Sequence, residues 1–151
     1  MSVDNPNEPS ATLPGTSRSL PISLAKAREK VMAPIRTMLA DAGISEQQWR
    51  ILRVLAEYGP LDGTTLADRA SLLLPSQTRI VQAMLERGYV TRTTDPNDRR
   101  RQTVAIAPKG QAIIDEHMVE AMRIVALFKQ ALGEAEYETL LDLLERVDQR
   151  L

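Results

Sequence analysis

The stretch that decides the fold covers residues 62–110 and reads DGTTLADRASLLLPSQTRIVQAMLERGYVTRTTDPNDRRRQTVAIAPKG. Its first half predicts two helices, over 64–71 and 75–87. Pro75 suits the first turn of a helix, and Gly88 suits the left-handed position that follows a helix end. Only three leucines separate the two helices. So short a connection is typical of a helix-turn-helix.

The second half of the stretch predicts a β-hairpin. Residues 89–94 are rich in β-branched side chains, DPND at 95–98 has a turn composition, and residues 102–106 are apolar again. Between residues 69 and 109, eight basic residues stand against three acidic ones, a net charge of +5, whereas the whole chain carries −1. A cationic segment in an otherwise acidic chain indicates a nucleic-acid surface. A charged face that is merely solvated remains the alternative.

Length and composition exclude several classes of protein. The chain has 151 residues, enough for one domain, which we place at 20–151; residues 1–19, rich in Pro, Ser and Asn, are expected to form a flexible arm. Without cysteine there is no disulfide scaffold or thiolate site, and with one histidine we expect no metal and no cofactor. No secretory signal or membrane-spanning run is evident, so we expect a cytoplasmic protein without membrane partners.

Amphipathic helices are predicted on both sides of the basic segment. Residues 20–44 form one, with a kink expected near Pro34, and Ser45 with Gln48 fits a capping box that opens the next helix. Two further apolar stripes lie within 110–151. The expected fold class is mainly α with a small β-hairpin (α+β). A domain this thin cannot hide the terminal stripes, so we expect a homodimer; an ordinary intrachain core is the alternative.

Several short pieces of the chain, in this order, resemble the winged helix-turn-helix of the MarR family of transcription regulators. These pieces are LADRA at 66–70, PSQTR at 75–79, LERGYV at 85–90, DPNDRR at 95–100 and PKG at 108–110. The resemblance implies a winged helix-turn-helix lobe at 45–109, with dimerisation helices at 20–44 and 110–151. It also implies a homodimer on double-stranded DNA that carries a pseudo-palindromic operator.

The presumed recognition helix and the hairpin tip supply the expected DNA contacts. The first turns of a recognition helix meet base edges, and Gln77 can pair with adenine while Arg79 can reach guanine or phosphate. By resemblance, Asp98 orients an arginine through a bidentate pair, and Arg99 or Arg100 enters the minor groove. The expected DNA-binding residues are Pro75, Ser76, Gln77, Thr78, Arg79, Asp98, Arg99, Arg100 and Arg101. Some, Ser76 above all, are alternatively helix caps, and Leu74 stands where many family members have a capping serine.

A narrower resemblance concerns the N-terminal half. Ser19-Leu20, Ala27-Arg28-Glu29, Arg36 and EQQWRILR at 46–53 resemble repressors of homoprotocatechuate degradation, the HpaR type. The resemblance implies repression of an aromatic-acid degradation operon, relieved by an aromatic compound.

From the residues, we expect Arg28 to grip a ligand carboxylate beside Trp49, with Arg18 or Arg50 assisting. Arg28 is alternatively in an ion pair with Glu29, Glu46 or a partner-chain acid, and Trp49 is alternatively a core residue. His117 can touch a phenol or titrate near neutral pH, but a lone helix histidine is usually structural.

Other functions remain to be weighed. Within DNA binding, the alternative is a regulator of efflux, stress or virulence genes that responds to other phenolics. An enzyme acting on small aromatic acids needs a positioned base and nucleophile, and neither constellation is present in the sequence, so we expect no enzyme. A purely structural dimer module leaves the arginine-rich hairpin without a purpose.

Overall fold

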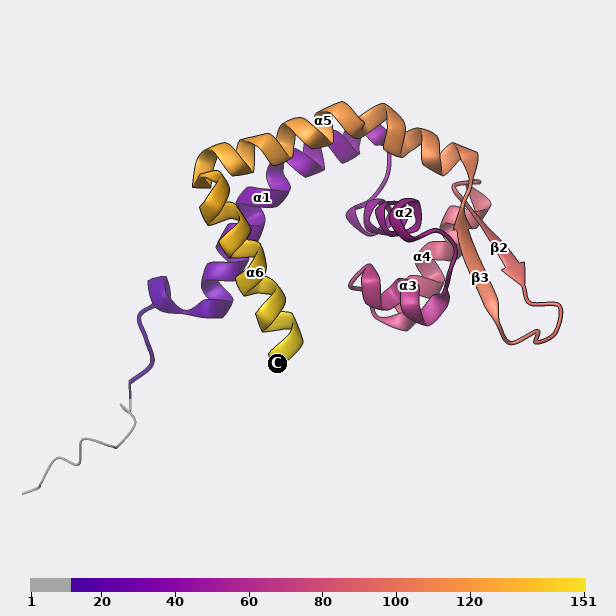
Figure 1. The fold of residues 1–151 in the computed structure, drawn as a ribbon, viewed down its shortest axis with the longest axis horizontal. Helices are drawn as coiled ribbons and strands as arrows, with labels where there is room; N and C mark the ends of the chain where they lie inside the picture. Colours follow the sequence, from indigo (N-terminus) through magenta and orange to yellow (C-terminus); the bar gives the residue numbers. More distant parts are fainter. Residues whose placement is uncertain (1–11) are drawn as a thin grey trace, which may run out of the picture. The chain divides into compact units, whose positions relative to one another are not determined.

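The computed structural model describes residues 12–151. It divides into two units, the first ending at Ala33 and the second running from Pro34 to Leu151. The mainly helical fold with a small antiparallel sheet confirms the predicted fold class. Figure 1 labels the elements along the chain. None of the helices in the described part is long and apolar enough to cross a bilayer.

The first unit contains a short 3-10 turn, Thr16–Arg18, and the beginning of helix α1, Leu20–Ala42. Of the predicted arm at 1–19, residues 1–11 lie outside the described residues, and its flexibility stays a prediction. Helix α1 continues through Pro34 into the second unit, so the proline does not end it. The predicted end is confirmed, because Gly43 follows with a φ of +70°.

Helix α2, Glu46–Tyr58, forms the centre of the second unit. The predicted capping box is confirmed: the Gln48 backbone N–H donates to Ser45 Oγ at 3.1 Å, and the Ser45 N–H donates to Gln48 Oε1 at 3.1 Å. Ile51, Leu52 and Leu55 are fully or almost fully buried. They join the end of α1 to the elements that follow in a single apolar core.

The predicted helix-turn-helix and hairpin are both present. Helices α3, Gly63–Arg69, and α4, Leu74–Glu86, pack on each other, and strands β2, Val90–Thr94, and β3, Gln102–Ile106, pair antiparallel. A third strand, β1, Leu61–Asp62, was not predicted; it pairs with β3 and gives the sheet order β1-β3-β2. Its two residues are too few to show a period, so only pairing with a distant strand defines them.

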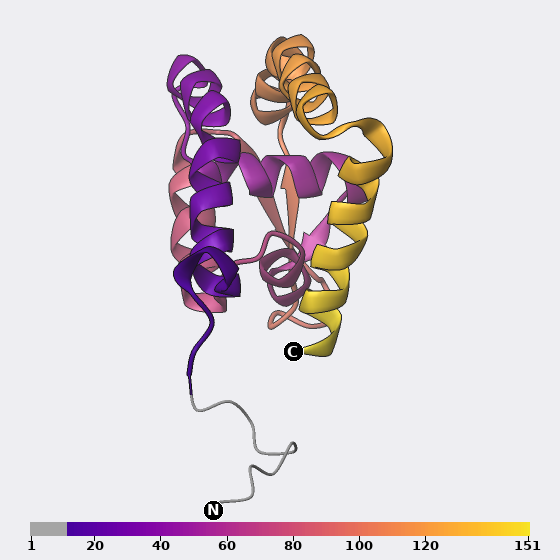
Figure 2. The same ribbon diagram turned by 90° about the vertical axis from the view of Figure 1, so that its left-hand side faces the viewer.

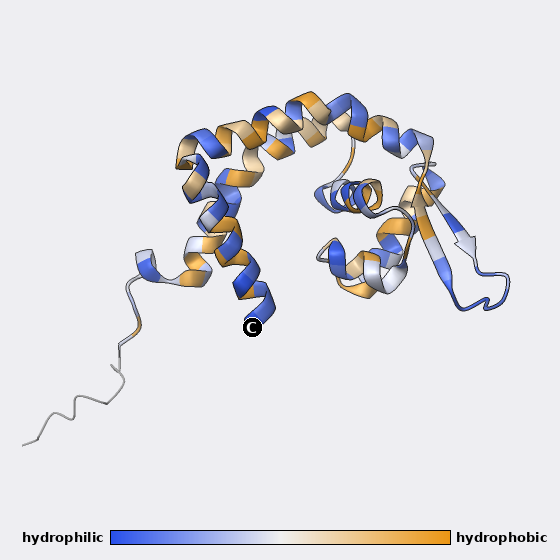
Figure 3. Ribbon diagram, in the orientation of Figure 1, coloured by the Kyte–Doolittle hydropathy of each residue, from blue (hydrophilic) through white to orange (hydrophobic). Residues whose placement is uncertain are grey.

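Helices α5, Pro108–Leu132, and α6, Glu134–Arg150, complete the second unit. Figures 1 and 2 show α5 passing over α2 and α6 turning back from the end of α5, at Gly133. The start of α5 is anchored in the core by Ile113 and Ile114. Helix α6, in contrast, has no buried residue in the single chain. Both helices nevertheless carry apolar residues, the orange segments of the ribbon in Figure 3, and many of these residues are exposed in the single chain.

Candidate nucleic-acid interface and an adjoining apolar cavity

Helix α4 presents its first turns at the surface, as expected of a recognition helix. Pro75, Thr78 and Arg79 are exposed and Ser76 is half-buried. The helix is held from its other side by Val81 and Met84, both fully buried. No side chain caps its start, because the N-cap residue is Leu73. Ser76 is therefore not the N-cap, which removes the main structural alternative to a DNA contact for that residue.

Gln77 departs from the expectation of an exposed base-reading amide. It is the one buried polar residue within the described chain, with 3% of its surface exposed. Its position, four residues before Val81 and seven before Met84, places it on the inward face of α4. Its Oε1 lies 3.4 Å from Thr78 Oγ1. This spacing was visible in the sequence and predicts burial rather than contact with a base.

The hairpin tip is ordered by two aspartates. Asp95 Oδ1 accepts the backbone N–H of Asn97 at 2.8 Å, and Asp98 Oδ1 accepts that of Arg100 at 3.0 Å. The same Asp98 oxygen lies 3.5 Å from Arg100 Nε. Asp98 thus holds the backbone turn and one guanidinium nitrogen, instead of forming the expected bidentate pair. The Arg100 side chain stays 95% exposed.

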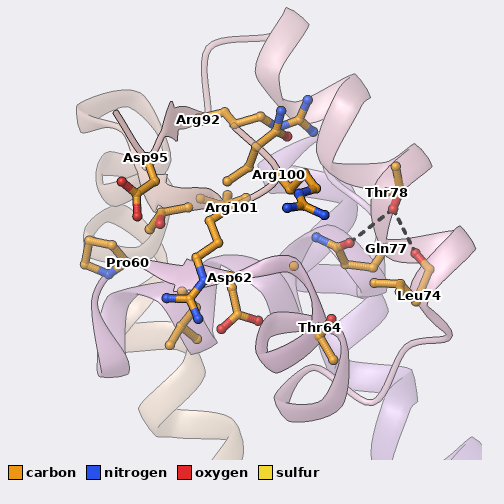
Figure 4. A pocket seen from close by; sticks show the side chains of 15 residues that line it. Pro60, Asp62, Thr64, Leu74, Gln77, Thr78, Arg92, Asp95, Arg100 and Arg101 are labelled. Atoms are coloured by element: carbon orange, nitrogen blue, oxygen red, sulfur yellow. Dashed lines mark hydrogen bonds between the residues drawn. The ribbon is translucent and has the colours of Figure 1, made fainter. Parts of the chain in front are cut away.

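A polar cavity of 810 Å³ lies between α4, the start of α3 and the hairpin. Figure 4 shows Arg92, Arg100 and Arg101 reaching it from the hairpin, with Gln77 and Thr78 on the opposite side. Four of the nine predicted DNA-binding residues line this cavity, namely Gln77, Thr78, Arg100 and Arg101. The other five do not: Pro75, Ser76, Arg79, Asp98 and Arg99. Arg92, on strand β2, was not among the predicted site residues. Its cationic side chain beside the wing was a signal available in the sequence.

Two carboxylates, Asp62 and Asp95, line the cavity together with these arginines. Asp62 caps α3, where its Oδ1 accepts the Thr65 backbone N–H at 2.8 Å and its Oδ2 accepts the Thr65 hydroxyl at 2.9 Å. The hydrogen bond from the Thr65 backbone lowers the pKa of the Asp62 carboxyl below its ordinary value of 3.8. Asp62 therefore stays ionised at neutral pH and is committed to the helix start.

Four of the eight basic residues counted in the sequence have structural partners, and one of these is exposed Arg100 beside Asp98. The guanidinium of Arg69 lies 3.9 Å from the ring centre of Tyr58. Arg87 donates to the carbonyl of Gly43 at 3.3 Å, and Lys109 donates to the carbonyl of Arg87 at 3.0 Å. The positive charge left for a ligand is therefore concentrated on α4 and the hairpin. Figure 3 shows the hairpin loop as a continuous hydrophilic segment.

A second, apolar cavity of 360 Å³ lies between the end of α1, α2 and α5. Its aromatic side chains are Trp49 and Phe128, and its cations are Arg53 and Lys129. Trp49 and Arg53 also line a neighbouring cavity of 310 Å³. Because they are four residues apart, the two side chains lie on one face of α2. This arrangement of aromatic rings and cations suits an aromatic ring that carries an anionic group.

Only one of the four predicted ligand residues lines this cavity. Trp49 does so, but Arg50 does not, because it is rotated about 100° around α2 from Trp49. The Nε atom of Arg50 is buried and has no hydrogen-bond partner within the described chain. Arg18 and Arg28 lie in the first unit, where both are exposed; Arg28 has an interaction partner. Sequence reasoning missed Arg53 and Lys129, although the Trp49 to Arg53 spacing pointed to Arg53.

His117 joins α5 to the end of α1. Its Nδ1 lies 2.9 Å from the carbonyl oxygen of Ile113, and its Nε2 lies 3.2 Å from Asp41 Oδ2. His117 does not line the apolar cavity. These contacts favour the structural interpretation of the histidine over contact with a phenol. Within residues 12–151, no group of three or more acidic or histidine side chains is placed to hold a metal ion.

Known proteins are similar both to the helix-turn-helix lobe and to most of the chain. The MarR family model matches residues 44–101. The HTH-type transcriptional regulator FarR of Neisseria gonorrhoeae is 37% identical over 83% of this chain and 86% of its own length. The homoprotocatechuate degradative operon repressor of Escherichia coli is 34% identical over 84% of this chain and 86% of its own.

A solved structure supports the same relationship. NadR in complex with 4-hydroxyphenylacetate is 35% identical to this chain, with a TM-score of 0.78, and the match covers 92% of this chain and all of NadR. The likeness therefore extends beyond the lobe to the flanking helices.

Proposed function

This chain belongs to the MarR family of transcription regulators, and from that premise we propose that it is a homodimeric repressor of an aromatic-acid degradation operon, relieved by a small aromatic carboxylate. The observation that carries the proposal is the apolar cavity in which Trp49 and Phe128 share walls with Arg53 and Lys129. The relatives are named transcriptional regulators, which supports a regulatory role over an enzymatic one.

The DNA contacts follow from the helix and hairpin. We assign base-edge contacts to the exposed first turns of α4 and minor-groove or phosphate contacts to the hairpin arginines. Arg99 and Arg100 stand at an exposed tip that two aspartates order. A guanidinium on such a tip gains from the concentrated negative potential of a narrow minor groove.

Dimerisation is supported by the exposed apolar side chains of α5 and α6. On α5 these are Met118, Val119, Met122, Val125, Leu127 and Leu132, and on α6 they are Leu140, Leu141, Leu143 and Leu144. Apolar surface on this scale is rare on a monomer and marks a protein interface. Two copies joined through these helices present two recognition helices to two half-sites.

The effector is proposed to bind in the apolar cavity and to act through α2. Its ring lies against Trp49, and its carboxylate pairs with Arg53 and Lys129. Helix α2 also packs on α3 and α4, so a shift of α2 is transmitted to the recognition helix. The ligand must bind the DNA-incompetent arrangement more tightly than the DNA-ready one. A coupling of about 1–3 kcal/mol gives roughly 5-fold to 150-fold derepression.

A titration tests both partners together. The protein is bound to promoter DNA from its own genomic neighbourhood, and 4-hydroxyphenylacetate or 3,4-dihydroxyphenylacetate is added. We expect release of the DNA at a ligand concentration that rises at least tenfold in Arg53→Ala, because the carboxylate loses its cation. Arg50→Ala is the matched control, since Arg50 lies on the same helix outside the cavity lining, and should leave the ligand response unchanged.

Each outcome of the titration separates one alternative. If DNA binds but no aromatic acid releases it, whereas another phenolic does, the chain is a regulator of a different gene set. If Arg50→Ala weakens the response and Arg53→Ala does not, the effector lies elsewhere. If no duplex binds at low ionic strength, DNA regulation itself is wrong.

A further inference from the structure

A pair of exposed leucines begins the recognition helix. In the described segment 44–107, the large apolar side chains left exposed are Tyr58, Leu73 and Leu74. Tyr58 is covered by the guanidinium of Arg69. Leu73 and Leu74 are 78% and 47% exposed, and α3, α4 and the turn between them cover neither. Of the two, Leu74 is the first residue of α4, the helix that the proposed function places in the major groove.

The two leucines face different surroundings. Leu74 lines the polar cavity with Gln77, Thr78 and the hairpin arginines, as Figure 4 shows. Leu73 instead lines a cavity formed with α2, α3 and α6, whose charged side chains are one cation, Arg69, and four carboxylates, Glu57, Asp68, Glu145 and Asp148. The surface around Leu74 is therefore net positive and suits a polyanion, whereas the surface around Leu73 is net negative.

The polar groups beside Leu74 are already engaged. Thr78 Oγ1 donates to the carbonyl oxygen of Leu74 at 3.0 Å, and Gln77 is buried. The hydroxyl hydrogen of Thr78 is thus committed to the helix, and the other group on its Cβ is a methyl. At the point where base-edge contacts are expected, the helix therefore presents the apolar side chain of Leu74 next to the hydrogen-bonding side chains of Ser76 and Arg79.

In the major groove, the apolar feature of a base edge is the 5-methyl group of thymine. We propose that Leu74 reads a thymine methyl in each operator half-site and so sets part of the sequence specificity. This inference rests on the proposed DNA-binding function. It assigns base recognition to Leu74, an apolar side chain that makes no hydrogen bond to the base. The hairpin arginines hold the backbone, while Leu74 discriminates thymine from cytosine at one position.

The size of the effect follows from the area of one methyl group. Burying a group of this size changes affinity by about fourfold at 25 °C. A dimer makes the contact twice, so removing both methyls lowers affinity by about fifteen-fold if the half-sites act independently.

The test uses deoxyuridine, which pairs like thymine but lacks the methyl group. The full chain first selects its own operator from a random duplex pool, and each thymine of the selected site is then replaced in turn. We expect one thymine per half-site at which deoxyuridine lowers affinity about fourfold. Leu74→Ala should bind the thymine and deoxyuridine duplexes equally, and Leu74→Met should retain part of the difference. Leu73→Ala, the adjacent matched control, should retain all of it.

The outcomes separate this inference from the function on which it rests. If no duplex is selected, the DNA-binding function fails. If a duplex is selected but no thymine shows a methyl effect, or if Leu74→Ala keeps that effect, the inference fails while DNA binding stands. Thermal unfolding of each variant checks that the fold is retained, which we expect because Leu74 is half exposed.

Discussion

At the scale of single residues, Asp62 links the start of α3 to the wall of the polar cavity. Its two carboxylate oxygens accept the N–H and the hydroxyl of Thr65. Side chains that cap a helix in this way contribute about 1 kcal/mol to stability. The hydrogen bond from the Thr65 backbone also lowers the pKa of Asp62. A carboxyl whose pKa is lower in the folded than in the unfolded state stabilises the fold at pH values above its unfolded-state pKa. That stabilisation is lost as the pH falls through the folded-state pKa.

We therefore predict that Asp62→Ala lowers the free energy of unfolding by about 1 kcal/mol at neutral pH. Asp62→Asn, which keeps the capping oxygen, should cost less. The difference between wild type and Asp62→Asn should shrink as the pH approaches about 3, because the wild-type carboxylate is then being protonated. Urea unfolding at the two pH values measures this. A difference that grows on acidification would show that Asp62 is not stabilised as a carboxylate.

Residue positions on helices were partly predictable from spacing. The capping box of α2 was identified from Ser45 and Gln48 because both partners lie within one turn. The burial of Gln77 and the place of Arg53 beside Trp49 follow from the same helical period, but residue chemistry was weighed above periodicity. Lys129 could not have been found in this way, because its position beside Trp49 depends on how α5 crosses α2.

At the scale of elements, the start of α5 packs tightly against the hairpin base. A Cβ atom at Gly110 would overlap the carbonyl oxygen of Tyr89 and lie 2.9 Å from Leu52 Cδ2. This close approach explains the glycine of the PKG segment. The hairpin is thereby fixed to α5, and the backbone N–H of Ala107 donates to the same Tyr89 carbonyl at 3.0 Å.

Gly110→Ala should therefore destabilise the protein by about 1–3 kcal/mol, the usual cost of overpacking. Gly15→Ala provides a matched control, because a Cβ there meets nothing within 4 Å. Thermal or urea unfolding of both variants measures the difference. Equal stabilities would mean that α5 can move away from the hairpin at little cost.

The hairpin arginines should govern the salt dependence of DNA binding. Each phosphate contact that is lost lowers the slope of log affinity against log salt concentration by about 0.9. Arg99→Ala combined with Arg100→Ala should lower both affinity and slope, whereas Arg146→Ala, an exposed arginine of α6, should change neither. Fluorescence anisotropy across a salt series provides the measurement. Unchanged binding in the double variant would favour a structural dimer module.

The elements themselves were well predicted where their signals are local. Helices begin and end at prolines and glycines that the sequence displays, such as Pro75, Gly88 and Gly133. Strand β1 was missed because its partner Val104 is far along the chain from Leu61. A strand of two residues is too short to show the alternating apolar and polar pattern by which strands are predicted from sequence.

At the scale of the whole molecule, the balance between buried and exposed apolar surface points to two chains. In the proposed dimer each recognition helix reads one half-site, and joining the two helices makes the second contact intramolecular. Helix α6 contributes no buried residue to the single chain, so its leucines are free to serve an interface. Acidic residues on that apolar face should therefore separate the dimer without unfolding the lobe, whose core lies in α2–α5 and β2–β3.

We predict that Leu141→Glu combined with Leu144→Glu yields a monomer with nearly unchanged helix content, and that its affinity for a two-half-site operator falls about a hundredfold or more. Ala135→Glu combined with Gln149→Glu adds the same charge on the face of α6 that points away from the four leucines and should remain dimeric. Sedimentation velocity and anisotropy measure the two properties. If the leucine variant remains a dimer, the dimer interface does not depend on these leucines of α6. A monomer that binds the full operator as tightly as wild type would mean that binding both half-sites at once adds nothing to the affinity, because a monomer can contact only one half-site at a time.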